Sequence, residues 1–365
     1  MNKVVYGLCD ASRQWYLKVV EVLTELGMTV GKFDKGLFTF KIDGLEGVIL
    51  IHVDDLLYAG TEKFLCTIIE QFKKKLKISR EDSTAFQYLG VSIRQTSEGI
   101  EMNQRSYVEG MKQDLLSKEA QANKERFVES EEISLFRHGI GQLGWVSSVS
   151  RPEVAFAYCT LSVIQAKPQV KDFRTYKKTI KDLQSRQWNI LVRAINMENL
   201  RMCVFCDASH GNLVGGASQV GYIVLLHDDL GNCAPLTWVS KKARRVARST
   251  LAAETLSAAD AADSAVFLKE SIEDILDTEL GPITVLVDNK SLYDAVRNTG
   301  VISERRLLIE LESLREMQEQ RKICVEWIPT HQQLADCLTK AGANKQPLID
   351  VLCHGKLDLD KLGSN

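Results

Sequence analysis

The stretch GVILIHVDDLLYAG, residues 47–60, places two adjacent carboxylates between two apolar runs. Buried strands exclude charged side chains unless these are paired or bind a cation. We therefore expect Asp54 and Asp55 at the tip of a hairpin with apolar arms. Upstream, GLFTFKIDG predicts another strand that turns at Gly44, and a helix is expected from about Ser12 to Leu26. The N-terminal segment is thus predicted to be a helix packed on antiparallel strands.

Length and composition limit the class of protein. A chain of 365 residues is long enough for two domains, and 45% hydrophobic with 26% charged residues is typical of a globular protein. With a net charge of −2, a nucleic acid has to be held by local basic patches and bound metal rather than by the overall field. The apolar runs are too short to span a membrane, and no signal peptide is apparent. We expect an intracellular protein without a membrane anchor.

The nine cysteines have no regular spacing, in keeping with a reducing compartment. Cys203 and Cys206 form a CxxC, which leaves two interpretations open: a zinc site, or two buried thiols. The pair lies in RMCVFCDAS, a predicted strand in which odd spacing points the two side chains to opposite faces. This favours buried thiols.

The rest of the chain predicts a fold of the α+β or α/β class. Residues 61–165 are expected to be mostly helical, with a hairpin formed by FQYLGVSI and GIEMNQ. Residues 166–200, polar and basic, are expected to be a helical connector. From residue 201 the order is three strands, a long helix, a strand, helices, a strand and a last helix that begins at QLADCLTK. Because helical crossovers join parallel strands, this order predicts a five-stranded mixed sheet with flanking helices over residues 201–345. Residues 346–365 are expected to be a C-terminal tail.

Four acids occupy apolar or small-residue contexts in this second part. Asp207 ends the first strand, Glu254 lies in the first turns of the long helix, Asp288 ends the fourth strand, and Asp336 is expected in the last helix. Carboxylates that converge on one point repel each other and raise each other's pKa unless cations neutralise them. Oxygen ligands suit hard ions such as Mg²⁺, and a pair of such ions supports phosphodiester chemistry.

The motifs, taken in order, resemble the Pol polyprotein of copia-type retrotransposons. Residues 1–165 are similar to the later part of the reverse transcriptase, through VYGLCDASRQWY, HVDDLLYAG, YLGVSI and GQLGWVSSVSRPEVAFA. Residues 201–340 are similar to the ribonuclease H domain, through CDAS, TWVSKK, RSTLAAET, VDNKSL and PTHQQLADCLTK. The resemblance implies a truncated palm with a thumb-like helical region, followed by a ribonuclease H-like fold.

The resemblance also implies roles for the acids. Asp54 and Asp55 match the metal-binding turn of the polymerase palm, although His52 stands where Tyr is common. Asp207, Glu254, Asp288 and Asp336 match four metal-binding acids that hold two Mg²⁺, or Mn²⁺, to cleave the RNA strand of an RNA/DNA hybrid. The family's third polymerase carboxylate and its fingers precede VYGL, so polymerisation by this chain alone is not expected.

Other residues are candidates for contacts with nucleic acid. In the family a loop histidine near the position of His331 assists proton transfer or product release; an ordinary loop histidine is the alternative. The basic run KKARRVARS lies just before the helix of Glu254 and is a candidate phosphate-binding loop or a solvated one. Its candidate ligands are Lys241, Lys242, Arg244, Arg245 and Arg248. Arg13 lies in a segment that family polymerases place against the template or nucleotide.

Three functions remain open at this point. The first is a working ribonuclease H within a polyprotein fragment, with a full-length Pol polyprotein as a further partner. The second is a remnant that binds hybrids without cutting them, and the third is an unstable relic. The family acts in the cytoplasm and the nucleus, and the sequence does not choose between these compartments.

Overall fold

The computed structural model describes residues 10–78, 80–117, 120, 123–213, 215–298 and 305–359. The VYGL segment and residues 360–365 of the expected tail lie outside these ranges. The chain forms two compact units, residues 1–88 with 267–280, and residues 89–266 with 281–365. This division differs from the boundaries at residues 165 and 200 that the composition indicated. Among the described residues, no helix combines the length and the apolar character needed to cross a membrane.

The first unit contains the hairpin that carries the acid pair. Its elements are α1 (Ala11–Glu25), β1 (Thr29–Val30), β2 (Leu37–Lys41), β3 (Leu45–His52), β4 (Asp55–Gly60), α2 (Glu62–Phe64), a π-helical turn (Leu65–Ile69), α3 (Glu70–Lys75) and β5 (Ala85–Tyr88). The strands β1-β2-β3-β4 form an antiparallel sheet in this order. Val19 and Leu23 of α1 pack against Phe38 and Ile49 of this sheet in a buried core. The predicted helix and hairpin are confirmed.

The second unit begins with a small sheet and a group of helices. These elements are β6 (Val91–Gln95), β7 (Ile100–Asn103), α4 (Arg105–Glu109), α5 (Ser130–Val149), a 3₁₀ turn (Pro152–Val154), α6 (Ala155–Ile164), α7 (Val170–Ser185), β8 (Ile190–Val192) and a 3₁₀ turn (Met197–Asn199). β6 and β7 form the predicted hairpin, and β8 extends it through antiparallel pairing with β7.

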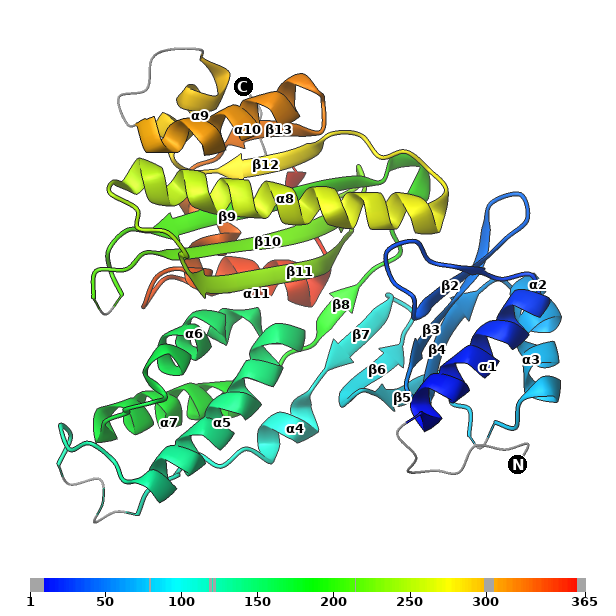
Figure 1. Cartoon of the computed structure of the whole chain (residues 1–365), viewed down its shortest axis with the longest axis horizontal. Helices are drawn as coiled ribbons and strands as arrows, with labels where there is room; N and C mark the ends of the chain where they lie inside the picture. The colour runs from blue at the N-terminus through cyan, green and yellow to red at the C-terminus, as the bar shows by residue number, and fades with distance from the viewer. Residues whose placement is uncertain are drawn as a thin grey trace. The chain divides into compact units, whose positions relative to one another are not determined.

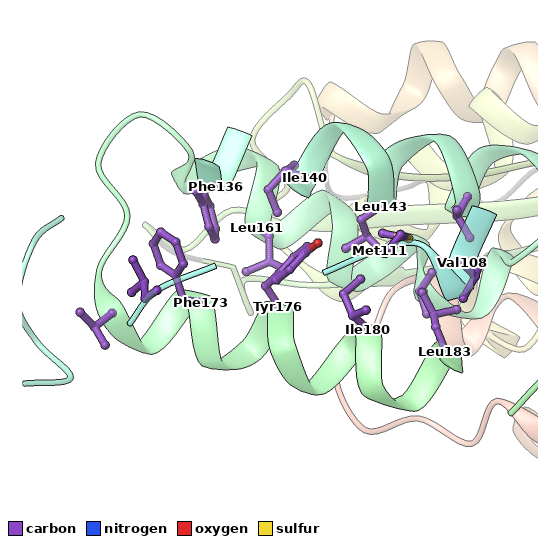
Figure 2. Packing of buried hydrophobic residues seen from close by; sticks show 14 of the residues in the cluster. Val108, Met111, Phe136, Ile140, Leu143, Leu161, Phe173, Tyr176, Ile180 and Leu183 are labelled. Atoms are coloured by element: carbon purple, nitrogen blue, oxygen red, sulfur yellow. The ribbon is translucent and has the colours of Figure 1, made fainter. Parts of the chain in front are cut away.

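Helix α7 is part of the helical core rather than a connector. Its buried residues recur at helical spacing, so that one stripe faces α5 and α6. Figure 2 shows Phe173, Tyr176 and Ile180 of α7 directed toward the side chains of α5. The ring centroids of Phe136 and Phe173 lie 4.7 Å apart. The expectation of a connector over residues 166–200 was therefore wrong: the polar residues of α7 cover only its outer face, and β8 belongs to a sheet.

The remainder of the second unit is a sheet covered on both faces; of helix α8 this unit includes residues 250–266, and residues 267–276 belong to the first unit. Its elements are β9 (Arg201–Ser209), β10 (Gln219–His227), β11 (Cys233–Lys242), α8 (Thr250–Leu276), β12 (Ile283–Val287), α9 (Lys290–Arg297), a 3₁₀ turn (Arg305–Leu307), α10 (Leu308–Glu319), β13 (Ile323–Trp327), 3₁₀ turns (Thr330–Gln332 and Leu334–Leu338) and α11 (Gln346–His354). The strand order is β11-β10-β9-β12-β13. β9 pairs antiparallel with β10 and parallel with β12, which confirms the expected five-stranded mixed sheet with flanking helices.

Helices α8 and α11 lie on opposite faces of this sheet (Figure 1). On the α11 face, Leu348 and Leu352 pack with Phe205 and Ile223 in one buried core. The expected C-terminal tail is therefore wrong for residues 346–357: apolar side chains at helical spacing bury this segment against the sheet. Leu357 is also buried, and its backbone N–H donates to the carbonyl of Gly231 at 2.7 Å.

Candidate metal centre

Two of the predicted acids meet because their strands are parallel. Asp207 lies near the end of β9, and Asp288 follows β12 directly. The carboxyl ends of parallel neighbours reach the same edge of a sheet, which brings the two side chains together. The indole N–H of Trp327 donates to the carbonyl of Asp288 at 3.0 Å and holds the backbone at this edge.

Glu254 reaches the same point from helix α8. The buried face of this helix consists mainly of alanines, so its axis can approach the sheet closely. Ser257, one turn after Glu254, donates its hydroxyl to the carbonyls of Asp207 at 2.8 Å and Gly221 at 3.2 Å. These bonds fix the helix over strands β9 and β10. One carboxylate oxygen from each of Asp207, Glu254 and Asp288 lies within 4.8 Å of the others.

The three carboxylates are held at a high electrostatic cost. Asp207 is fully buried and Glu254 nearly so, whereas Asp288 is half-buried. Burial, followed by the charges of Asp207 and Asp288, raises the pKa of Glu254 to about 9. Burial also raises the pKa of Asp207 to about 6, against the opposing effects of Lys340 and Thr339. Such a cluster favours the uptake of a cation, because a cation relieves both the desolvation and the repulsion.

Asp336 is placed differently from the other three. It lies in the 3₁₀ turn Leu334–Leu338 and not in a last α-helix, which begins only at Gln346. Four of the five residues of this turn are buried, so the segment has no polar face of the kind an amphipathic surface helix needs. Within the described part of the chain, the group of three carboxylates does not include Asp336. Its carboxylate instead forms an ion pair with Lys340.

The turn that carries Asp336 is fixed to the sheet by residues that the sequence did not single out. The side-chain amide of Gln333 donates to the carbonyl of Cys206 at 2.9 Å. Gly221 faces Asp207 across the β9–β10 ladder, and a Cβ there would lie 2.8 Å from atoms of both Leu338 and Thr339. Gly221 thereby allows the turn to lie against β10. The sequence pointed to these residues only through the motif PTHQQLADCLTK, which contains Gln333 and ends in Thr339 and Lys340.

His331 is exposed in the 3₁₀ turn Thr330–Gln332. Its Nε2 lies 3.5 Å from Nε2 of Gln332. Among the described residues it has no hydrogen bond or ion pair with any of the acids.

The basic run divides into paired and exposed cations. Lys241 forms an ion pair with Asp260 at 2.9 Å, and Arg245 forms one with Glu310. The other three cations are exposed and have no ion-pair partner among the residues that the structure describes: Lys242, Arg244 and Arg248. These three are the stronger candidates for contacts with phosphate.

The acid pair of the first unit lies at the tip of the β3–β4 hairpin, as predicted. His52 lies opposite Asp55 in the register of the two strands, and both Asp54 and Asp55 are exposed. Val53 adopts a left-handed conformation with φ +52°, and its carbonyl accepts a hydrogen bond of 2.9 Å from the indole of Trp15. In the described residues, no third carboxylate groups with this pair. Arg13 is exposed on α1, two residues before Trp15.

The CxxC pair lies in β9, and both thiols are buried. Cys203 packs in the core beside Phe205, and burial raises the pKa of both thiols, that of Cys206 with a further contribution from the nearby acids.

Comparison with known proteins agrees with the motifs. Residues 1–124 match the family described as reverse transcriptase (RNA-dependent DNA polymerase). The retrovirus-related Pol polyprotein from transposon RE1 of Arabidopsis thaliana is 24% identical over 93% of this chain and 24% of its own length. The corresponding polyprotein from transposon TNT 1-94 of Nicotiana tabacum is 22% identical over 93% of this chain and 27% of its own length.

Among solved structures, the N-terminal ribonuclease H domain of rv2228c from Mycobacterium tuberculosis is 18% identical, with a TM-score of 0.30. The match covers 38% of this chain and 91% of that chain. The chain spans about a quarter of the length of the plant polyproteins that it matches. The resemblance that the motifs indicated is confirmed: over nearly its whole length, the chain is similar to the retrovirus-related Pol polyproteins of copia-type transposons.

Proposed function

We propose that this chain cleaves the RNA strand of RNA/DNA hybrids as a ribonuclease H. The observation that carries the proposal is the convergence of three carboxylates from β9, α8 and β12 on one point at the edge of the five-stranded sheet. A hydrolase for phosphodiesters needs such an oxygen-rich site, and a purely structural role does not explain three acids with oxygens within 4.8 Å of each other.

The donor set fits a pair of hard divalent cations, Mg²⁺ or Mn²⁺. Asp207, Glu254 and Asp288 would hold them, and Asp336 is proposed as a fourth ligand from the neighbouring turn. Ions held there would supply Lewis-acid activation of a water for attack on phosphorus and stabilisation of the departing 3′-oxygen, and the products would carry 5′-phosphate and 3′-hydroxyl ends. The protein's own residues set the position: Ser257 and Gln333 fix the backbone of β9, and Trp327 fixes that of Asp288.

The substrate is proposed to be held through its backbone. Lys242, Arg244 and Arg248 lie on the segment that leads into α8 and therefore precede Glu254 by at most twelve residues. Exposed cations of this kind pair with phosphates independently of sequence. An RNA strand is distinguished from DNA by its 2′-hydroxyls and by the shape of the hybrid. His331, exposed on the loop before Asp336, is proposed to assist proton transfer or product release.

The proposal assigns hydrolysis rather than polymerisation to this chain. Asp54 and Asp55 match the metal-binding turn of the polymerase palm, yet among the described residues no third carboxylate joins them. Primer extension on an RNA template with deoxynucleotides and Mg²⁺ tests the assignment. Extended product that disappears in an Asp55→Asn variant would contradict it.

The hydrolase itself is tested with a hybrid labelled on its RNA strand, incubated with the purified chain in Mg²⁺ or in chelator. Asp288→Asn should abolish cleavage, because it removes one carboxylate of the cluster. Asp294→Asn is the matched control, because Asp294 is exposed on α9 and outside the cluster. Binding of the hybrid without cleavage by folded wild-type protein would instead indicate a non-catalytic hybrid-binding remnant.

A further inference from the structure

Lys340 lies where a cation is needed. Its side chain is 37% exposed, and its ammonium bridges two acids. Nζ lies 3.2 Å from Oδ1 of Asp207, a fully buried carboxylate, and forms a second ion pair with Asp336. A single positive charge therefore joins the central acid of the cluster to the acid that the structure leaves outside it.

Both oxygens of Asp207 already have a donor. Lys340 contacts Oδ1, and the hydroxyl of the preceding residue, Thr339, donates to Oδ2. Each of these oxygens keeps a second lone pair, so a metal ion that binds Asp207 at Oδ1 would share this oxygen with the ammonium. A divalent cation at this oxygen would repel the ammonium of Lys340, because two cations at the same oxygen repel each other.

The bridge depends on the position of the turn and not on Lys340 alone. The turn lies close to β10 only because residue 221 has no side chain. The ammonium lies between the carboxylates of Asp207 and Asp336, and this arrangement depends on the turn staying in place.

We infer that Lys340 is a built-in counter-ion, which holds Asp207 and Asp336 in the metal-free protein and which an incoming divalent cation displaces. The inference rests on the proposed function, since it concerns the same metal centre. Displacement of Lys340 releases Asp336 at the moment when the metal arrives, and so explains how the fourth acid joins the site. Lys340 is a positioning residue that lowers the affinity for metal and stabilises the metal-free site.

Lys340→Met tests the inference, because methionine keeps an unbranched apolar stem and removes the charge. Without a charge to displace, the full chain should bind Mn²⁺ about tenfold more tightly in isothermal titration, since one close charge shifts such equilibria by roughly a factor of ten or more. The metal-free variant should also unfold at a lower temperature than wild type in chelator. Lys340→Arg should keep wild-type behaviour, and Lys322→Met controls for the loss of one exposed charge.

Unmodified protein provides a measurement that does not depend on the folding of a variant. The ¹⁵N signal of the Lys340 ammonium, assigned by its loss in Lys340→Arg, should shift when the chain is saturated with Mg²⁺. Wild-type binding of metal with no shift of this signal, and with equal Mn²⁺ affinity in Lys340→Met, would overturn the inference while the metal centre stands. Failure of folded wild-type protein to bind any divalent cation would instead overturn the proposed function.

Discussion

Glu254→Gln should stabilise the metal-free protein, although it removes a proposed metal ligand. The glutamate is 6% exposed, and its pKa in the folded chain is raised from 4.5 to about 9. The folded state therefore keeps the proton between these two values, while the unfolded state loses it. Since the folded state binds more protons in this range, its stability falls as the pH rises.

The magnitude follows from the distance between the working pH and the ordinary pKa of glutamate. At pH 7 this distance is about 2.5 pH units, and each unit corresponds to about 1.4 kcal/mol, so Glu254 destabilises the metal-free fold by about 3 kcal/mol. Glutamine has a similar shape and no charge to lose. The gain in unfolding free energy should therefore be below about 1 kcal/mol at pH 5 and approach about 3 kcal/mol at pH 7.

Denaturant unfolding in chelator at pH 5, 7 and 8.5 measures this difference. Glu270→Gln is the control, because Glu270 is exposed on the same helix. With saturating Mg²⁺ wild type should become more stable than Glu254→Gln, because ligand binding stabilises only the protein that retains the site. Parallel pH curves for wild type and Glu254→Gln in chelator would refute the reasoning, since they would mean that the folded chain does not hold the extra proton.

Three further outcomes are expected. Gly221→Ala should push the turn of Lys340 off β10 and cost about 1–3 kcal/mol in urea unfolding, whereas Gly281→Ala, where a Cβ meets no atom within 4 Å, should stay within about 0.5 kcal/mol. Tyr176→Phe should leave the unfolding free energy unchanged or raise it by about 1 kcal/mol, because the hydroxyl is buried without a partner among the described residues. A decrease in the unfolding free energy would show that the hydroxyl has a hydrogen-bond partner. Burial lowers the pKa of His227 from 6.5, against the bond to the carbonyl of Asp228, so the unfolded state gains a proton first and stability should fall below about pH 6.5. His227→Asn should flatten that part of the curve in acid unfolding, and an unchanged slope would assign it to other groups.

The sequence by itself was sufficient for the elements whose pattern is local. The alternation of GVILIHV and DLLYAG predicts the hairpin with Asp54 and Asp55 at its tip, and the structure has it there. Parallel pairing of two predicted strands likewise brings Asp207 and Asp288 to one edge. These predictions succeed because side-chain period and strand direction are properties of short segments.

The tertiary structure alone decided which residues complete the site. Asp207 and Lys340 are 133 positions apart, and their contact exists because a turn without helical periodicity packs against a glycine in β10. The same holds for α7, whose polar surface suggested a connector although its apolar stripe closes a core with α5. Such contacts depend on the summed packing of distant segments, and no local pattern records which partner a buried face or a lysine side chain meets.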